Sequence, residues 1–594
     1  FYFKNNELIT NLKCFNFQIE ITKKIKEIDV LVIGSGMAGL GAGRVLYTEG
    51  IDFLILEGRS RAGGRVYTKT LPPVEDLPSM DVDLGANYLI GCSNKFTEQP
   101  LLGLAKEANI ETVTCAGDLV RKYGGWECPE VGSWKNYKTG NDIPMEIVVS
   151  MSHLYDMTVS LMTSKYYKLS SAVKCKISMK HVFDRCLNDL LDLYYANGLR
   201  SSAVLNELES GVFEALKSRL LTYQSPLHQL SLDILHDIAI AANKKTRVFK
   251  VKPLSESEIS TWIAMINLRI KAMSEHPPSV TTKVISNHED KLVTNRFSNF
   301  IDLFKSDLPV NYNQIAKKID YRNPDEIIVT CIDPNTGDLI RYKCKHCIVT
   351  VPVGVLARLS NIAAINFVPT LPEDKIKSIK RLALPSIGAE THNKVVLRYR
   401  PSDVFWDKKV PHLKANTGKL HILNFHSYGK PGLLVCHIWG GTEIKTIDHT
   451  DEEIVDIILT LLQGMYQKLG TLPKPIQTLV TRWSEDPFSL GSYTPGGPLS
   501  TNDDRKSYAR AIPEDGSPRI FFAGEGTLGE FEAKECTHGA LMNGMHKAAE
   551  IVSFYHPKRP IFLDKPSNYL KRKLKSLEPI DDSPEVKRLK KSVL

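Results

Sequence analysis

A glycine-rich turn near the start of the chain has the residue pattern of a phosphate-binding site. Residues 29–65 contain an apolar run, a glycine turn, a helical stretch and a second apolar run that ends on Glu57. Gly34 would permit the tight turn, Gly36 would let the backbone approach a pyrophosphate, and Gly39 would let helix and strand pack closely. The helix N-terminus would face the phosphates, and the acid could accept hydrogen bonds from both ribose hydroxyls. This order predicts a dinucleotide-binding βαβ unit rather than a glycine-tolerant turn without a ligand.

A second stretch rich in glycine and arginine follows this unit. Residues 58–65 read GRSRAGGR, which adds flexible glycines and three arginines that a nicotinamide site does not need. The run resembles the ExRxRxGGR signature of flavin-containing amine oxidases, in which it lies along FAD. The resemblance implies that FAD is the cofactor and that Ala38, Arg59 and Arg65 help to bind it.

The resemblance extends over several hundred residues. Further segments similar to family motifs are Met80–Gly91, Cys347–Leu356, Phe367–Pro372, Arg519–Glu525 and Cys536–Ala540. The chain most resembles the polyamine oxidases and the related flavin-dependent histone lysine demethylases within this family.

These segments imply further contacts with FAD. Asn87 and Tyr88 would lie near the isoalloxazine ring, and Ala316 takes the place of the residue whose backbone meets the adenine. Glu525 would contact the ribityl and pyrophosphate groups. Cys536 and Thr537 open a helix whose N–H groups would face the pyrimidine edge of the flavin, where a positive helix end favours the anionic reduced form.

Three residues are implied to take part in catalysis. Lys394, in an NKVxL-like motif, would hold a water near flavin N5 and assist reoxidation; the alternative is a surface lysine on an edge strand. Trp483 would stack near the flavin and Tyr493 would form one wall of an aromatic cage; the alternative is that both are core aromatics. Ser492 stands where monoamine oxidases have the cysteine that bonds flavin, so FAD is expected to be noncovalent.

The sequence departs from the family pattern at positions that concern the substrate. Ile90 stands where polyamine-oxidising members usually have His or Glu, and Cys536 stands where relatives have Thr or an aromatic residue. Gly526 follows Glu525, where a bulkier residue is common. Since the changes at Ile90 and Cys536 are not expected to disturb flavin binding, they bear on the identity of the amine.

The resemblance implies oxidation of a polyamine, such as spermine or an acetylated polyamine, to an imine, with O2 reduced to H2O2. Two alternatives stay open: demethylation of a lysine side chain on a histone, and a catalytically weak flavin-binding scaffold. Ile90 supports the scaffold alternative, because its side chain cannot hydrogen-bond to a substrate amine. The expected partners are a small-molecule amine and O2, without a membrane, and with nucleic acid bound only nonspecifically if at all.

The elements that position these residues form an α/β fold of two interleaved domains. A Rossmann-type, glutathione-reductase-like FAD domain is expected in the stretches 29–91, 289–356 and 511–555, after an N-terminal segment 1–28. An α+β substrate domain is expected in 92–288, largely helical, and in 357–510. The expected helices are Leu101–Ile110, Met145–Met162, Val182–Asn197, Leu205–Leu221 and Leu227–Ala242.

Composition and charge describe a globular body with a basic tail. The chain has 594 residues and a net charge of +9, and residues 556–594 hold eleven Lys and Arg against five Asp and Glu. Two basic clusters at 571–575 and 587–591 resemble a bipartite nuclear import signal, which would engage an import receptor and place the protein in the nucleus rather than the cytoplasm; the alternative is a tail without specific function. The eleven cysteines fit free thiols, and Cys344-Lys-His-Cys347 lacks the second ligand pair of a zinc site. The first residue is Phe, which is compatible with a fragment of a longer protein.

Overall fold

The computed structural model describes most of the chain, but not its ends. The described ranges, with a few single positions between them, are 25–92, 99–119, 132–166, 179–196, 200–217, 289–383, 392–417, 421–439, 446–494, 500–514, 516–529 and 535–557. The helix expected at Leu227–Ala242 and both basic clusters of the tail lie outside these residues. No helix in the described part of the chain has the length and apolar character needed to cross a membrane.

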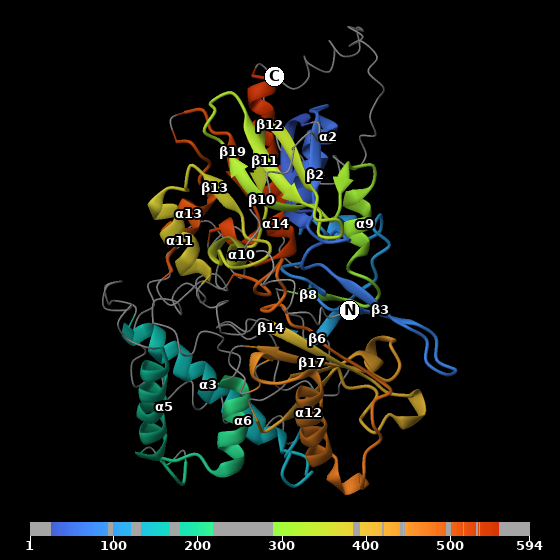
Figure 1. Cartoon of the computed structure of the whole chain (residues 1–594). Coiled ribbons are helices and arrows are strands. Elements are labelled where there is room, and N and C mark those ends of the chain that lie inside the picture. Colours follow the sequence, from blue (N-terminus) through green and yellow to red (C-terminus); the bar gives the residue numbers. More distant parts are fainter. Residues whose placement is uncertain are drawn as a thin grey trace, which may run out of the picture.

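One half of the molecule, which contains the predicted FAD domain and is called the FAD half below, is built around one large sheet. This sheet is drawn in the upper part of Figure 1. Its strand order is β13-β10-β11-β12-β1-β2-β9, and β19 pairs with the end of β12. The residues of β1 from Val30 to Ile33 are almost completely buried, which is typical of a parallel strand covered on both faces. The strands are β1 (Lys26–Ile33), β2 (Phe53–Leu56), β9 (Val310–Asn311), β10 (Ile315–Asp320), β11 (Ile327–Ile332), β12 (Leu339–Val349), β13 (Asn366–Val368) and β19 (Ile520–Phe522).

Two helices from opposite ends of the chain pack against each other on one face of this sheet. These are α2 (Met37–Thr48) and α14 (Thr537–Tyr555), and Figure 1 shows them side by side behind the strands. Glycine makes their approach possible, because a Cβ at Gly544 would lie 1.9 Å from the carbonyl oxygen of Ala38. The short helix α9 (Asn299–Lys305) completes this layer.

On the other face of the sheet, the FAD domain extends beyond the boundaries predicted at residues 356 and 511. Strand β13 pairs with β10, and the core beneath it includes residues of α11 (Glu373–Ala383) and α13 (Asn502–Ala509). The second and third stretches of the domain are therefore longer than predicted, and α10 (Val353–Ala357) lies inside the second. Leu101 and Leu104, assigned to the substrate domain, also pack into the FAD-domain core.

The second half is organised around a six-stranded sheet of order β18-β14-β17-β16-β15-β7. One face packs on helix α12 (Asp451–Met465), which begins with a capping box at Thr450 and Glu453. Val396 and Val435 on the opposite face meet Leu84 from the FAD half. The strands are β7 (Ser133–Lys135), β14 (His392–Arg398), β15 (His412–Ala415), β16 (His421–Asn424), β17 (Leu433–Trp439) and β18 (Gln477–Val480).

Helices α3 (Met145–Tyr166), α5 (Met179–Ala196) and α6 (Glu207–Lys217) form a separate cluster beside this sheet, close to the ranges predicted for them. The helix predicted at Leu101–Ile110 is wrong: the segment is a 3₁₀ turn, η2 (Leu102–Leu104), followed by further turns. A stretch of this length with an internal glycine does not sustain a helix without strong support. Small sheets join the halves, from β3 (Thr68–Leu71) with β4 (Met80–Asp83), and β5 (Tyr88–Leu89) with β8 (Glu289–Val293) and β6 (Thr112–Leu119).

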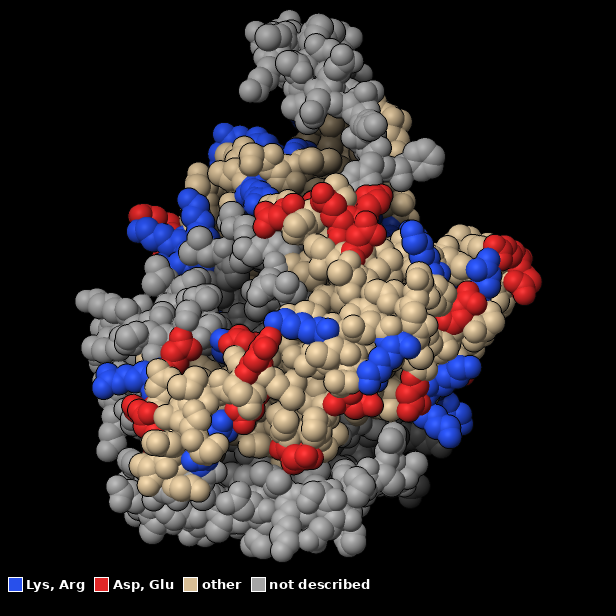
Figure 2. Space-filling model, turned by 90° about the horizontal axis from the view of Figure 1, so that it is seen from below, with Lys and Arg blue, Asp and Glu red and all other residues tan. Residues whose placement is uncertain are grey.

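Short 3₁₀ turns complete the described elements: η4 (Pro401–Asp403), η5 (Phe425–Tyr428), η6 (Thr446–Asp448), η7 (Gln467–Leu469) and η8 (Glu525–Thr527). Figure 2 shows the end of the molecule that carries the substrate half, where acidic and basic side chains alternate over the surface. On this face the described residues form no broad field of one sign, which agrees with the concentration of positive charge in the tail.

Candidate active site

A cavity of about 410 Å³ lies between the two halves of the molecule. Its walls come from β1 and the turn after it, from the segment that follows β4, from the β14, β16 and β17 strands, and from the start of α14. Of the predicted site residues, all except Gly39 line it: Gly34, Gly36, Ala38, Glu57, Arg59, Arg65, Asn87, Tyr88, Ala316, Lys394, Trp483, Tyr493, Glu525, Cys536 and Thr537. The chain thus brings together segments separated by up to five hundred residues.

The glycine turn after β1 forms an open cradle at one end of the cavity. Gly34 has a positive φ of 106°, and a Cβ at Gly36 would find its nearest heavy atom only at 3.9 Å, so it would extend into the cavity. The N-cap of α2 is Gly36 itself, which leaves the first N–H groups of the helix without a side-chain cap. Gly39 does not line the cavity. A Cβ there would lie 1.8 Å from the carbonyl oxygen of Gly34, which agrees with its predicted role in close helix–strand packing.

Glu57 is fixed at the end of β2 by hydrogen bonds to both of its carboxylate oxygens. Oε2 accepts from the backbone N–H and the hydroxyl of Ser35, at 2.9 and 2.8 Å, and Oε1 accepts from the backbone N–H of Arg59 at 2.9 Å. A carboxylate has about four acceptor positions, so one position on Oε1 is left for a ribose hydroxyl. Glu57 can therefore accept one hydrogen bond from a ribose hydroxyl, whereas two were predicted.

The predicted arginines are held in place by acids from the last third of the chain. Arg59 contacts Asp486 at 2.7 Å and the hydroxyl of Ser489 at 3.0 Å. Arg65 lies 3.0 Å from Glu525, and the Glu525 carboxylate also accepts from the hydroxyl of Thr494 at 2.6 Å. These ion pairs fix both guanidinium groups beside the glycine turn, where a pyrophosphate would lie.

A second helix begins at the cavity. The N-cap of α14 is Cys536, and its side chain does not cap the helix. Because both α2 and α14 begin at the cavity without side-chain caps, two positive helix ends face the same space. The open cradle and the two uncapped helix ends fit a dinucleotide that is anionic at its pyrophosphate and electron-rich at its flavin pyrimidine, as FAD is.

Lys394 crosses the boundary between the two halves from the middle of the β14 strand. Its ammonium donates to the carbonyl oxygens of Asp83 and Gly85, at 3.0 and 2.6 Å, and to Oδ1 of Asn87 at 2.9 Å. Burial lowers the pKa of Lys394 to about 7; nearby Asp83 raises it and Lys430 lowers it further. The alternative of a surface lysine is wrong, because the side chain is only 4% exposed. Its three N–H donors are all used by the protein, so a water can be held only when one of these contacts is exchanged.

The aromatic residues and Ile90 form the rest of the substrate side. Trp483 lines the cavity and its indole Nε1 donates to the carbonyl oxygen of Leu84 at 3.2 Å. Tyr493 and Ile90 also line the cavity, as does Ser492. Both aromatic residues therefore contact the cavity rather than only the core.

Three histidines of the substrate-half sheet also line the cavity, and sequence analysis did not find them. His392 Nε2 lies 2.8 Å from His437 Nδ1, and the ring of His421 follows 6.0 Å from that of His437. Burial, together with the charge of Lys394, lowers the pKa of His392 to about 3, which keeps this imidazole neutral. The available signal was strand alternation, because His392 precedes Lys394 by two residues and must share its face.

No group of three His, Cys, Asp or Glu suited to a metal ion occurs among the residues the structure places. Cys344 and Cys347 lie in the sheet interior, where burial raises the pKa of both thiols, that of Cys344 to about 12. They are buried thiols of β12.

Comparison with known proteins agrees with this geometry. The family model described as flavin-containing amine oxidoreductase matches residues 37–552. A lysine-specific histone demethylase 1 homolog 1 of Oryza sativa subsp. japonica is 27% identical over 535 residues, covering 88% of this chain and 52% of that relative. The chain spans about half the length of the curated demethylase relatives it matches.

Polyamine oxidase 5 of Oryza sativa subsp. japonica is also 27% identical, over 530 residues that cover 88% of this chain and 87% of that relative. A solved putrescine oxidase superposes with a TM-score of 0.54 at 16% identity, covering 89% of this chain and all of that one, which shows the fold. The chain belongs to the flavin-containing amine oxidoreductase family, whose cofactor is FAD.

Proposed function

We propose that the protein oxidises an amine to an imine in the cavity between its two halves. Bound FAD would accept the two electrons and the hydrogen of the amine α-carbon, and O2 would then be reduced to H2O2. Water hydrolyses the released imine to an aldehyde and the remaining amine. The observation that carries the proposal is that Lys394, Trp483 and Tyr493 line the same cavity as the two uncapped helix ends.

The residues that line the cavity would act mainly by positioning the amine and the cofactor. Trp483, Tyr493 and Ile90 supply an apolar and aromatic surface that orients the α-carbon and excludes water. The positive end of α14 favours negative charge on the pyrimidine side of the cofactor. Lys394 adds a positive charge that is lost by deprotonation as the pH rises through neutrality, since its pKa is about 7.

Polyamines are the first proposed substrate class. Support comes from the relation to polyamine oxidase 5, which extends over 87% of that protein's length. Ile90 lies in the cavity wall where polyamine-oxidising members usually have His or Glu. Its side chain cannot hydrogen-bond, so this position offers no acid or imidazole to bind the amine. The neutral His392 and its partner His437 also line the cavity and could take this place.

Demethylation of a protein lysine is the second candidate. Support comes from the curated relatives named as lysine-specific histone demethylase homologs, which match 88% of this chain. The chemistry at the α-carbon is the same in both cases, so the difference lies in what reaches the cavity.

Anaerobic reduction of the flavin separates these hypotheses. Purified holoprotein is mixed with spermine, with N1-acetylspermine or with a dimethyl-lysine peptide, and loss of the oxidised flavin absorbance is followed. Bleaching by the polyamines alone supports the first proposal, and bleaching by the peptide alone supports the second. A fully loaded flavin that none of these amines reduces would contradict the proposed oxidase and favour a flavin-binding scaffold.

We also propose that the basic tail directs the protein to the nucleus through an import receptor. Support comes from its two basic clusters and from the demethylase names among the relatives. A fluorescent fusion should lose nuclear accumulation when Lys571, Arg572, Lys587 and Arg588 are replaced by Ala, while its FAD content stays the same. Equal distribution of the two fusions would contradict this proposal.

A further inference from the structure

Three successive backbone carbonyls beside the cavity accept hydrogen bonds from side chains of the substrate half. The oxygens of Asp83 and Gly85 accept from Lys394, and the oxygen of Leu84 between them accepts from the indole of Trp483. Asp83 is the last residue of β4, and Leu84 and Gly85 lead from it to Asn87 and Tyr88, which line the cavity. The position of this wall segment therefore depends on how Lys394 and Trp483 are held.

Asn393 links these two residues from the opposite face of β14. Its Oδ1 accepts from the backbone N–H of Trp483 at 3.0 Å and from the hydroxyl of Thr481 at 3.1 Å. The same hydroxyl accepts from the backbone N–H of Lys394 at 2.8 Å, and the backbone N–H of Thr481 donates back to the carbonyl oxygen of Lys394. The hydroxyl thus continues the strand pairing beyond the end of β18 at Val480.

The orientation of the Asn393 carboxamide is fixed by the chemistry of its neighbours. A backbone N–H is only a donor, so Oδ1 must face Trp483 and Nδ2 must point away from it. Nδ2 donates to the hydroxyl of Thr446 at 3.3 Å, and that hydroxyl donates to Glu485 at 3.2 Å. The side chain is fully buried and all of its polar atoms are paired.

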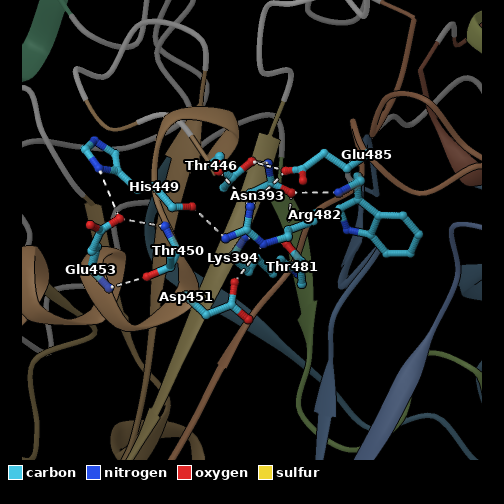
Figure 3. Close-up of polar contacts among 11 residues, drawn as sticks. Asn393, Lys394, Thr446, His449, Thr450, Asp451, Glu453, Thr481, Arg482 and Glu485 are labelled. Atoms are coloured by element: carbon cyan, nitrogen blue, oxygen red, sulfur yellow. Dashed lines mark hydrogen bonds and ion pairs between the residues drawn. The ribbon is translucent and has the colours of Figure 1, made fainter. Parts of the chain in front are cut away.

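The same segment is anchored to the start of α12 by Arg482 (Figure 3). Its guanidinium contacts Asp451 at 2.7 Å and donates to the carbonyl oxygens of Thr446 and His449 at 2.6 and 2.8 Å. Arg482 precedes Trp483 in the chain, so its contacts hold Trp483 only indirectly, through the connecting backbone. Asn393 holds the backbone of Trp483 directly.

We propose that Asn393 is a positioning residue for the flavin site. It holds the backbone of Trp483 directly and that of Lys394 through Thr481, and these two side chains fix the carbonyls of residues 83–85 at the cavity wall. Loss of Asn393 then alters the environment and affinity of FAD, although Asn393 itself does not line the cavity. The inference requires only the bound cofactor and holds whichever amine is the substrate.

Asn393→Leu tests the proposal because it keeps the shape of the side chain and removes all three hydrogen bonds. We expect the dissociation constant of FAD to rise about tenfold or more, since buried groups left unpaired are costly. We also expect a shift of the visible flavin spectrum and of its midpoint potential. Asn393→Asp keeps the two contacts accepted by Oδ1 and should restore the wild-type spectrum.

Thr446→Val is the matched control. It removes the partner of Nδ2 and leaves the contacts of Oδ1 with Thr481 and Trp483, so it should lower the melting temperature without changing the flavin spectrum or the affinity for FAD. Trp483→Phe removes the contact with Leu84. If Asn393 acts through Trp483, adding Asn393→Leu to Trp483→Phe should cause less further change in FAD affinity than Asn393→Leu causes alone.

A folded Asn393→Leu variant with wild-type FAD affinity, spectrum and midpoint potential would overturn the proposal. So would effects on FAD affinity that simply add in the double variant, because they would show two independent roles. If Asn393→Leu does not accumulate as folded protein, Thr481→Val removes the hydroxyl relay instead. A wild-type flavin spectrum and affinity in that variant would also contradict the inference, and a spectral shift would support it.

Discussion

Replacing Lys394 by Met removes a buried positive charge from the cavity wall. The ammonium is held by three oxygen acceptors and its pKa is lowered to about 7 by burial. Below pH 7 the charged group keeps all three contacts. Above pH 7 the neutral amine has two N–H groups for three acceptors, so one contact is released and the charge is lost.

We expect the reoxidation of reduced flavin by O2 to slow as the pH rises through about 7. A positive charge stabilises the negative charge that develops on O2, and within several ångströms it contributes on the order of 2 kcal/mol at an effective dielectric constant of about 20. This corresponds to a roughly thirtyfold difference in rate. Lys394→Met should be slow at every pH and should show no transition near pH 7.

The assay is stopped-flow mixing of reduced holoenzyme with O2 from pH 5.5 to 9, at saturating FAD because the variant also loses contacts of the cavity wall. Lys430→Met is the matched control: this partly buried lysine donates to the carbonyl oxygens of Asp81 and Asn295 and does not line the cavity. It should keep the transition and move it slightly upward, because the charge of Lys430 lowers the pKa of Lys394. An unchanged pH profile in Lys394→Met would refute the reasoning.

The remaining predictions concern the cofactor cradle, a buried lysine and the substrate wall. Gly36→Ala should raise the dissociation constant of FAD at least about tenfold in a binding titration, with the stability of the apoprotein within about 0.5 kcal/mol of wild type, because its Cβ would meet only the cavity; unchanged affinity would contradict the cradle. Lys375 donates to three carbonyl oxygens at the end of α13 and its pKa is lowered to about 7. Between this value and its ordinary pKa near 10.5 the unfolded chain binds more protons, so the free energy of unfolding of wild type relative to Lys375→Met should rise with pH, by up to about 4 kcal/mol in denaturant titrations; a flat difference would be the contrary result. Ile90→Glu should tighten spermine binding at least about fivefold in anaerobic titrations by adding a carboxylate to the wall, and no change would count against a polyamine substrate.

Local sequence was sufficient for the parts of the site that one short segment builds. The turn at Gly34–Gly39 and the acid at Glu57 follow from spacing alone, because a strand, a tight turn and a helix leave little choice of geometry. The structure agrees with the separate roles predicted for the glycines: Gly36 opens onto the cavity, whereas Gly39 is required by close packing. Motif resemblance similarly located Lys394 and Trp483, which the structure places at the same cavity.

Element types were also largely predictable, and boundaries were not. The periodicity of α3 and α5 gave these helices nearly correct limits. The assignment of β13 to the substrate domain was wrong, because its three residues join the FAD sheet through pairing with β10, a contact that no local pattern records.

What the sequence determined by itself is the glycine turn and the acid of the dinucleotide cradle, since backbone conformation within one βαβ unit fixes them. What only the tertiary structure decided is the wall opposite that site. His392 and His437 meet across two strands, and Trp483 reaches the carbonyl of Leu84 from 399 positions away in the chain. The first contact depends on the pairing of β14 with β17, and the second depends on how the two halves of the molecule face each other. The spacing of residues along one strand or helix carries no information about either arrangement.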